Sequence, residues 1–342
     1  MGAQQRLTDL WYREPDRASL LQPLAWLYGA VVRLRRAAYG SGLIVTERAG
    51  CPVVVIGNLT VGGTGKTPLT IWLARELVGH GLRVGILSRG YGRRERAPRE
   101  VLVGSDWREV GDEPLLLARH SACPTFVAAD RVAGARALTA RGVQVILADD
   151  GLQHLRLGRA CEIVVVDGAR GFGNGRLLPA GPLREPLAAL ARADVVVTNG
   201  AATHGSLARP PPGPGPLTMS LVAGEAVRLD AAAAPRPLPA FRGQRVHAVA
   251  GIGNPRGFFL QLAGFGIKVV PHPFPDHYAF TPEDLEFGDG LPVMLTEKDA
   301  VKLRHAAKPD WWVLPVSAQL DPAFGEWLLG RLDGFRRRSK TA

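Results

Sequence analysis

Short runs of consecutive apolar residues recur along the first part of the chain, and segments with helical or loop-like patterning separate them. Continuous apolarity is typical of strands that are buried on both faces of a parallel sheet. Alternation of such runs with helical segments indicates an α/β sheet with helices on both faces. The predicted strands of this sheet are Val53–Ile56, Val84–Leu87, Val143–Ala148, Ile163–Val166 and Val195–Thr198.

The pattern changes between residues 203 and 242, where prolines and glycines concentrate in the run 209–217. Proline does not continue a helix or a central strand, so we expect a linker or exposed loop. A second set of apolar runs then predicts a smaller α/β domain, with strands at Val246–Ala250, Lys268–Val270, Pro292–Leu295 and Trp312–Leu314. We therefore expect a helical region at 1–40, a first domain at 41–202, a linker at 203–242, a second domain at 243–332 and a basic tail at 333–342.

Near the N-terminus, five large apolar residues recur at the spacing that places them on one face of a helix, namely Leu20, Leu24, Leu27, Val31 and Leu34. The uncharged stretch 18–32 is shorter than the roughly 20 apolar residues that a spanning helix requires. Acidic residues precede it and arginines follow it, which is the wrong polarity for a signal peptide. The pattern predicts an amphipathic helix that either lies in a membrane interface or packs as the first helix of the domain.

Composition adds a charge preference to this picture. The 342 residues are 46% hydrophobic and 21% charged, which excludes global disorder. The net charge of +11 suggests an anionic partner such as nucleic acid, a phosphorylated metabolite or an acidic lipid surface, although compositional drift toward arginine explains it equally well. Cys51, Cys123 and Cys161 are widely spaced and form no zinc or redox motif, so we expect reduced thiols in a cytosolic protein.

A glycine-rich turn between the first predicted strand and a helix start carries the clearest chemical signal. It reads Thr60-Val61-Gly62-Gly63-Thr64-Gly65-Lys66-Thr67. It differs from the general phosphate-loop pattern only at Thr60, where that pattern has glycine. Backbone N–H groups of such a turn surround phosphate oxygens, while Lys66 can reach the β- and γ-phosphates and the Thr67 hydroxyl can bind Mg²⁺.

Lysine usage strengthens this interpretation. Lys66 is the only lysine in residues 1–267, where the other basic residues are arginine or histidine. A compact ammonium suits this position and a planar guanidinium does not. We therefore expect ATP and Mg²⁺ to bind on a P-loop NTPase-like, mostly parallel sheet with helices on both faces.

A second metal-binding element is expected at the end of a neighbouring strand. The apolar run 143–148 ends in Asp149 and Asp150, and either carboxylate could bind Mg²⁺ directly or through water. Paired carboxylates at a strand end are common on solvated surfaces, but downstream of a phosphate loop they favour a metal site.

Seven further segments are more specific than these general patterns: Ser88–Gly92 (SRGYG), Gly111–Pro114 (GDEP), Asp149–His154 (DDGLQH), Leu178–Glu185 (LPAGPLRE), Gly251–Pro255 (GIGNP), Phe274–Tyr278 (FPDHY) and Leu295–Lys302 (LTEKDAVK). With the phosphate loop, this ordered set resembles the tetraacyldisaccharide 4'-kinase family from about residue 15 to 330. That family also has Thr or Ser at the first loop position, so Thr60 is expected within it.

The resemblance implies a reaction and a location. The γ-phosphate of ATP would pass to the 4'-hydroxyl of a tetraacylated glucosamine disaccharide 1-phosphate, forming lipid IVA in lipid A biosynthesis. Because an acylated acceptor does not leave the bilayer, the resemblance favours the interfacial interpretation of the N-terminal helix. It implies a peripheral enzyme on an anionic membrane surface, at the cytoplasmic face of the inner membrane.

The resemblance also assigns residue roles. It pairs Asp112, as base or orienting acceptor for the hydroxyl, with His277 of the second domain, which requires the domains to close over the site. Without it, we would interpret Asp112 as a helix cap and His277 as a surface histidine. The residues expected to contact the disaccharide are Arg89, Tyr91, Gln153 and His154, and candidates for anionic lipid or phosphate contact are Arg170, Arg176 and Arg184.

Three other functions fit parts of the sequence. A P-loop GTPase or ATPase switch at the membrane is the main alternative, because Thr296–Asp299 superficially resembles the element with which GTPases read guanine. A nucleic-acid-binding ATPase would need a basic groove with interleaved aromatics, but the arginines are scattered and only 7% of residues are aromatic, so we expect no nucleic-acid partner. A membrane-binding module without activity would leave the phosphate loop unexplained. The oligomeric state is not predicted.

Overall fold

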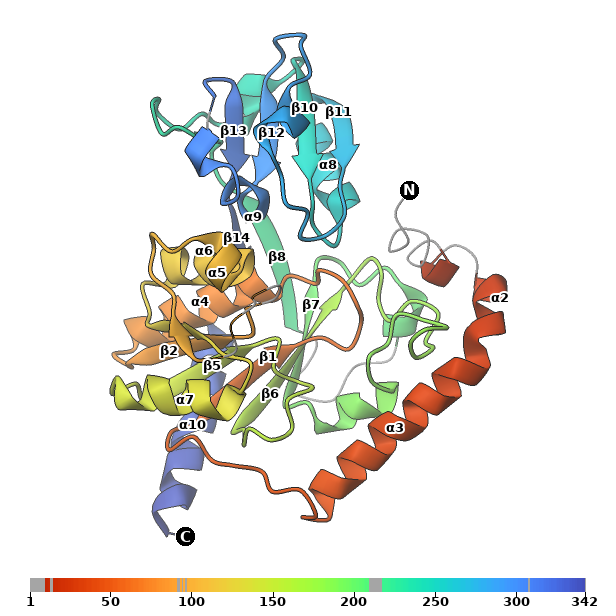
Figure 1. Cartoon of the computed structure of the whole chain (residues 1–342), viewed down its shortest axis with the longest axis vertical. Coiled ribbons are helices and arrows are strands. Elements are labelled where there is room, and N and C mark those ends of the chain that lie inside the picture. Colours follow the sequence, from red (N-terminus) through yellow and green to blue (C-terminus); the bar gives the residue numbers. More distant parts are fainter. Residues whose placement is uncertain are drawn as a thin grey trace.

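The larger of two sheets forms the body of the protein in this computed structural model, which describes residues 10–12, 15–90, 93, 95, 97–208, 217–306 and 308–341. It has nine strands in the order β14-β8-β7-β6-β1-β5-β2-β4-β3 (Figure 1). The central pairs are parallel, whereas β3·β4 and β8·β14 are antiparallel. Its strands are β1 (Val53–Gly57), β2 (Val84–Ser88), β3 (Arg99–Glu100), β4 (Thr125–Val127), β5 (Val145–Asp149), β6 (Cys161–Asp167), β7 (Val195–Asn199), β8 (Leu217–Ala223) and β14 (Val316–Gln319).

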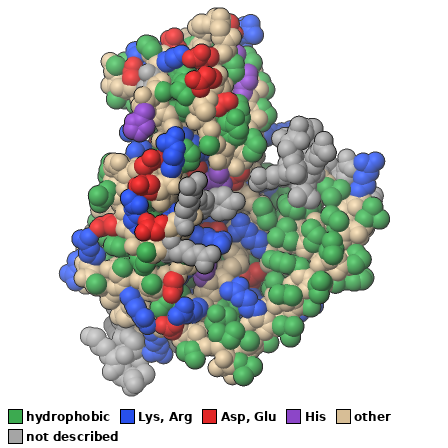
Figure 2. Space-filling view, in the orientation of Figure 1, with side chains coloured by type: hydrophobic (Ala, Val, Ile, Leu, Met, Phe, Trp, Pro, Cys, Tyr) green, Lys and Arg blue, Asp and Glu red, His purple; other side chains and the backbone are tan. Residues whose placement is uncertain are grey.

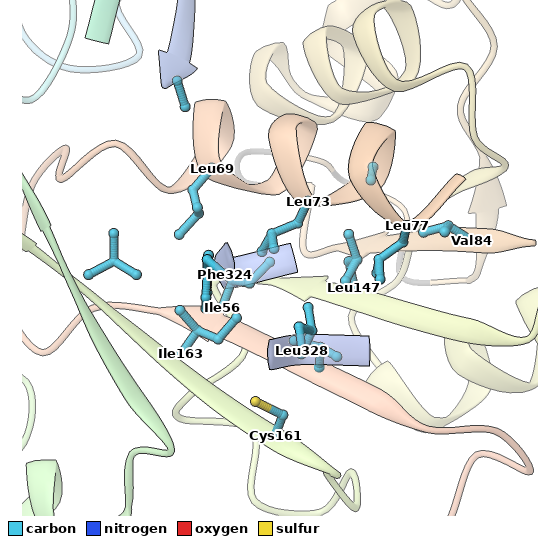
Figure 3. Packing of buried hydrophobic residues seen from close by; sticks show 14 of the residues in the cluster. Ile56, Leu69, Leu73, Leu77, Val84, Leu147, Cys161, Ile163, Phe324 and Leu328 are labelled. Carbon is cyan, nitrogen blue, oxygen red and sulfur yellow. The ribbon is translucent and has the colours of Figure 1, made fainter. Parts of the chain in front are cut away.

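Helices cover both faces of this sheet, as predicted, because each central strand is apolar on both sides. On one face, leucines of α4 and residues of the C-terminal helix pack over Ile56 and Ile163 (Figure 3). On the other face, α7 packs against Val53 and Val55. The helical segments of this domain are α4 (Lys66–Gly79), α5 (Trp107–Val110), α6 (Asp112–Ser121), α7 (Arg131–Ala140), η2 (Leu187–Arg192), η3 (Gly205–Leu207) and α10 (Ala323–Thr341).

The smaller sheet belongs to the second domain and has five strands in the order β11-β10-β12-β13-β9. Four are parallel, and β9 pairs antiparallel with β13. Its strands are β9 (Val227–Arg228), β10 (Arg245–Ala250), β11 (Lys268–Pro273), β12 (Val293–Thr296) and β13 (Trp311–Leu314). The accompanying helical segments are η4 (Leu238–Phe241), α8 (Pro255–Gly264), η5 (Pro282–Leu285), α9 (Glu297–Ala300) and η6 (Arg304–Ala306).

The domain boundaries differ from those expected from the sequence. The segment expected to be a linker, 203–242, contains β8 of the larger sheet and β9 of the smaller one. The chain then returns, because β14 pairs with β8 and α10 packs on the core of the larger domain. β8 is buried at one central position and half-buried or exposed at the others, so it lacks the continuous apolarity that identified the central strands. Residues 209–216 of the predicted linker lie outside the described part of the chain.

The predicted N-terminal helix is present as α3 (Gln22–Gly40), preceded by α2 (Pro15–Ala18) and η1 (Ser19–Leu21). It runs along one side of the larger domain (Figure 1). Small residues face the protein, with Ala25 and Gly29 buried. The large apolar side chains face outward, and their exposed fractions are 84% for Leu20, 56% for Leu24, 65% for Leu27, 56% for Val31 and 69% for Leu34. Figure 2 shows hydrophobic side chains gathered along this side of the molecule.

Candidate active site

The phosphate loop connects the carboxyl end of β1 to α4, so its N–H groups stand at a helix N-terminus, where anions bind. Gly62 and Gly65 have φ values of 106° and 95°, a region that residues with a Cβ rarely adopt. Gly65 is also crowded, because a Cβ there would lie 2.7 Å from Asn199 Nδ2. Glycine is therefore required immediately before Lys66.

Side chains outside the loop hold its carbonyl oxygens. Asn58 Nδ2 donates to two of them at 2.8 and 3.1 Å, and Asn199 Nδ2 donates to that of Thr64 at 3.1 Å. Because C=O and N–H point in opposite directions across a trans peptide, the bonds to Gly62 O and Thr64 O direct the N–H groups of Gly63 and Gly65 to the other side. The Val61 N–H, which follows the Thr60 carbonyl, instead donates to Pro182 O at 2.8 Å. Lys66 Nζ donates to Asn58 Oδ1 at 3.1 Å. The loop is thus a preformed anion-binding nest with an ammonium group beside it.

The paired carboxylates at the end of β5 have different surroundings. Asp150 lies 3.5 Å from Lys66 Nζ, and Arg184 Nη1 donates to it at 3.2 Å. Burial disfavours the charge of Asp150, but Lys66 and Arg184 outweigh burial, and its pKa lies well below the usual range. Asp149 is 1% exposed, and within the described residues neither of its carboxylate oxygens has a hydrogen-bond partner. Burial, reinforced by the charge of Glu113, raises the pKa of Asp149 to about 7.

Asp112 of the larger domain and His277 of the second domain contact each other across the domain boundary. Asp112 begins α6, whereas His277 follows β11, and His277 Nδ1 lies 3.1 Å from both carboxylate oxygens of Asp112. His277 has a φ of 61°, an uncommon conformation for a residue with a Cβ. Burial opposes the charge of Asp112, but the hydrogen bond with His277 and the charge of Lys298 hold its pKa well below the usual range. Burial likewise lowers the pKa of His277, but the same hydrogen bond outweighs it, and the net pKa is raised.

Two lysines of the second domain surround this pair. Lys298 Nζ, in α9, donates to Glu113 Oε1 at 2.9 Å and lies 3.4 Å from His277 Nε2. It also donates to Asp276 Oδ1 at 3.0 Å. Lys302 Nζ lies 3.3 Å from Asp112 Oδ2. The segment 295–302 therefore supplies cations that face the acidic start of α6 in the other domain.

Asp299 of the same segment points into the second domain. It is fully buried and accepts hydrogen bonds from Gly251 N at 2.9 Å and from Thr296 Oγ1 at 2.6 Å. Lys302 Nζ donates to its other oxygen at 3.2 Å. The carboxylate that would have to read guanine is thus already engaged, and the structure gives no support to that interpretation.

A cavity of about 220 Å³ opens beside the acidic start of α6. It brings together three of the four residues expected to contact the disaccharide, and the fourth, Tyr91, lies outside the described residues. Burial, followed by the charges of Arg131 and Arg89, lowers the pKa of His154 to about 4. The cavity is lined by Ser88, Arg89, Asp112, Glu113, Pro114, Asp150, Gln153, His154 and Arg184.

A second cavity, of about 420 Å³, lies between the phosphate loop and the second domain. Its floor contains Lys66 and Thr67, and its apolar walls come from both domains. Such a slot, with a nest for phosphates at one end, fits a nucleotide. Its apolar lining residues are Ile71, Leu116, Leu221, Ile252, Phe258, Leu314 and Val316.

Helix α3 contacts the wall of the first cavity. Tyr28 donates a hydrogen bond through its hydroxyl to Arg184 O at 2.8 Å, and Arg36 forms an ion pair with the buried carboxylate of Glu185. Gln153 Nε2 also approaches Glu185 Oε1, at 3.4 Å. The helix that carries the exposed apolar face is therefore bonded to residues next to the cavity.

Sequence reasoning placed the phosphate loop, the paired carboxylates, Asp112 and His277 at one site, and the structure brings them together there. It missed Glu113, and it gave no role to Lys298 or Lys302. One signal was available for the two lysines, because the chain has only six lysines and three of them, at 66, 298 and 302, lie here. Of the three candidate arginines, Arg184 lines the cavity, Arg176 Nη1 donates to Ser19 Oγ, and Arg170 contacts the phosphate loop.

The fold and the site together define a P-loop phosphotransferase with a two-domain cleft. The tetraacyldisaccharide-1-P 4'-kinase family profile matches residues 17–333, and the chain belongs to this family. A tetraacyldisaccharide 4'-kinase from Alkalilimnicola ehrlichii is 52% identical over 97% of this chain and 99% of its own, and one from Pseudomonas putida is 46% identical over 99% and 100%.

A solved structure supports the same assignment. LpxK from Aquifex aeolicus, described as a crystal structure in complex with ATP, matches with a TM-score of 0.74 and 29% identity over 92% of this chain and 99% of its own. These findings confirm the predicted fold class and identify the chain as a kinase of lipid A biosynthesis rather than a regulatory switch.

Proposed function

We propose that residues 60–67 hold the triphosphate of ATP while Asp112 receives the 4'-hydroxyl of an acylated glucosamine disaccharide 1-phosphate. The observation that carries this assignment is that the two cavities adjoin, because Glu113 lines both. A donor phosphate held by Lys66 in one cavity therefore faces an acceptor in the other. The complex of the Aquifex relative with ATP supports ATP as the donor.

The residues beside the loop fit Mg²⁺. Asp149 offers two buried carboxylate oxygens that have no hydrogen-bond partner among the described residues, and Thr67 stands at the start of α4. Within that same part of the chain no three His, Cys, Asp or Glu side chains form a metal cage, which suits an ion bound by one or two carboxylates together with phosphate oxygens. Bound Mg²⁺ would neutralise charge on the β- and γ-phosphates. Asp149 is the direct ligand in this proposal, whereas Asp150 fixes Lys66 and Arg184.

Asp112 acts here as an orienting acceptor for the hydroxyl. Its depressed pKa keeps it ionised at neutral pH, so it can accept the hydroxyl hydrogen bond at any physiological pH. Phosphoryl transfer has a loose transition state, and the proton need not leave before the new P–O bond begins to form. His277 fixes the carboxylate, and Arg89, Gln153 and His154 place the sugar. Tyr91 remains a proposed contact.

The apolar face of α3 is proposed to dock on the membrane. Five large apolar side chains face solvent while small residues face the protein, the reverse of a helix that packs through its hydrophobic side. Three further exposed apolar residues, Leu43, Ile44 and Val45, follow the end of the helix in the chain. Among the described residues, no helix is long and apolar enough to cross a membrane. We propose peripheral attachment at the cytoplasmic face of the inner membrane, where ATP and the acylated acceptor meet.

Cosedimentation with anionic vesicles tests this docking. Leu27→Asp combined with Leu34→Asp places two charges on the exposed face of α3 and should leave most of the protein in the supernatant. Leu102→Asp with Val103→Asp is the matched control, because these residues are similarly exposed on another surface. Equal sedimentation of the two double variants would reject α3 as the docking element.

Lys66→Ala tests the donor site. We expect kinase activity to be lost, because the ammonium that reaches the β- and γ-phosphates is removed. Lys268→Ala, at an exposed lysine on β11, should keep wild-type activity. A folded Lys66→Ala protein with near-normal transfer would reject the site.

A further inference from the structure

The backbone of the phosphate loop closely approaches the backbone of the second domain at Gly63 and Gly253. Gly253 lies in the turn between β10 and α8, and an ideal Cβ on it would overlap the Gly63 nitrogen. In the opposite direction, a Cβ on Gly63 would lie 3.7 Å from the Cα and N atoms of Gly253. A methyl group therefore does not fit at Gly253, whereas one at Gly63 would make ordinary van der Waals contact with Gly253. The distance between these turns therefore reports directly how closely the second domain approaches the loop.

Arg170, a residue of the larger domain, bonds to both turns. Its Nη2 donates to Gly63 O, its Nη1 donates to Gly253 O at 3.1 Å, and its Nε donates to Asp167 Oδ2 at 2.9 Å. A guanidinium presents donors in a fixed planar fork, whereas an ammonium is a single point with free rotation. Only arginine can span three acceptors in this arrangement.

Asp167 and the turn that carries Gly253 are themselves held in place. Asp167 ends β6, and its Oδ1 accepts from the backbone N of Ala169 and of Arg170, each at 3.0 Å. Asn254 Nδ2 approaches Asp167 Oδ2 at 3.3 Å, while its own Oδ1 accepts from Gly257 N and so caps α8. We call Asp167, Arg170, Gly253 and Asn254 the interdomain latch.

The latch acts on the loop through one peptide. Arg170 draws the Gly63 carbonyl toward the second domain, and the N–H of Thr64, on the opposite side of the same peptide plane, is directed into the nest. Asn199 holds the next carbonyl in the same way. Two successive N–H groups thus converge where a phosphate oxygen would bind, and the first is set by a residue that also holds the second domain.

We propose that Arg170 is a positioning residue that couples the phosphate-binding conformation of the loop to closure of the second domain. The inference rests on the proposed assignment of residues 60–67 to the triphosphate. In this coupling, the loop adopts its phosphate-binding conformation only when the second domain closes. A change on either side of the latch therefore weakens ATP binding and leaves the acceptor site intact.

Two different perturbations test the coupling. Arg170→Met removes the hydrogen bonds, and Gly253→Ala keeps them but inserts a methyl group against the Gly63 backbone. Arg170→Met should raise the KM for ATP by about 10- to 100-fold, the range expected for charge-assisted bonds of about 1.5–3 kcal/mol. Gly253→Ala should also raise the KM for ATP, because the added methyl group pushes the two turns apart. Both variants should change the KM for the lipid by less than twofold. Arg170→Lys should not rescue, because one ammonium cannot span the three acceptors. Gly264→Ala, in open space at the end of α8, is the matched control and should behave as wild type.

Domain closure can be measured in the same variants. Spin labels on Leu102→Cys and Leu260→Cys, exposed positions on the two domains, are introduced together with Cys51→Ala. With a non-hydrolysable ATP analogue at saturation, the wild type should show one short interdomain distance, and Gly253→Ala and Arg170→Met should show a longer or broader distribution.

Any of three results would overturn the coupling. The first is a KM for ATP within twofold of wild type in folded Arg170→Met. The second is a raised KM for ATP in Arg170→Met but not in Gly253→Ala. The third is an interdomain distance equal to that of wild type in both variants. Should Gly253→Ala not fold, Arg170→Met and Arg170→Lys still decide the outcome. Lys66→Ala separates this proposal from the site assignment: defective Lys66→Ala beside normal latch variants refutes the latch alone, whereas normal Lys66→Ala refutes the loop assignment itself.

Discussion

Asp149→Asn should make the protein more stable at alkaline pH while removing its activity. Asp149 is fully buried beside Glu113, and in the described part of the chain its carboxylate oxygens have no hydrogen-bond partner. Ionising such a group in the folded state is unfavourable unless a cation is bound. Asparagine has nearly the same shape and carries no charge at any pH, so it isolates the effect of the charge.

The magnitude follows from the pKa. Asp149 has a pKa of about 7 in the folded protein, against 3.8 as the ordinary value. Because the folded pKa is raised, the folded state is fully favoured below about pH 3.8 and loses stability as pH rises toward 7. At about 1.4 kcal/mol per pKa unit, the loss is about 2 kcal/mol at pH 5.5 and about 4 kcal/mol at pH 8.

Urea unfolding in the presence of EDTA, at pH 5.5 and pH 8, measures this effect. The buried amide of asparagine costs about 1–3 kcal/mol at both pH values, so the absolute difference between variant and wild type is less informative than its change with pH. We expect the free energy of unfolding of Asp149→Asn, relative to wild type, to rise by about 2 kcal/mol from pH 5.5 to pH 8. Asp106→Asn, at an exposed helix cap of the same domain, should show no such change. A difference that is equal at the two pH values would refute the reasoning.

Two further changes probe the acid–base pair. Asp112→Asn should lower kcat by about 10²- to 10⁴-fold with little change in the KM for ATP, because it removes the acceptor for the hydroxyl; steady-state kinetics with unchanged kcat would contradict this role. Lys298→Met should move the acidic limb of the kcat–pH profile to higher pH, because Lys298 lowers the pKa of Asp112, which must be ionised to accept the hydroxyl hydrogen bond. Lys308→Met, at an exposed lysine paired with Glu286, should leave the profile unchanged.

The central strands and the phosphate loop could be predicted from sequence because both have local signatures. Strands buried on two faces are continuously apolar, and the loop needs glycines at fixed spacing before Lys66. The last two strands on one side of the larger sheet could not be predicted in this way. β8 and β14 are identified only by their pairing, such as that of Ser220 with Gln319, which no local pattern encodes.

The second half of the site depends on contacts that are distant in sequence. Asp112 and His277 are 165 residues apart, and only the family resemblance joined them before the structure did. The spacing of apolar residues likewise predicted helix α3, but it did not predict which face of the helix packs against the protein. Contact of Gly29 with Leu177, where a Cβ would lie 2.8 Å from Leu177 Cδ1, shows that the small residues form the packing side. The sequence singled out Arg170 and the segment Gly251–Pro255, but it could not show their contact, because two of the three acceptors of Arg170 are backbone carbonyls, which every residue has.

The most direct test of the two-domain site follows labelled phosphate from ATP to the lipid. Wild-type protein, Lys66→Ala and His277→Ala are incubated with γ-labelled ATP and a detergent-dispersed tetraacylated glucosamine disaccharide 1-phosphate. We predict label on the lipid with wild type, none with Lys66→Ala, and strongly reduced label with His277→Ala, whose partner Asp112 lies in the other domain. Lipid labelled at the wild-type rate by folded Lys66→Ala, or by folded His277→Ala, would contradict the account.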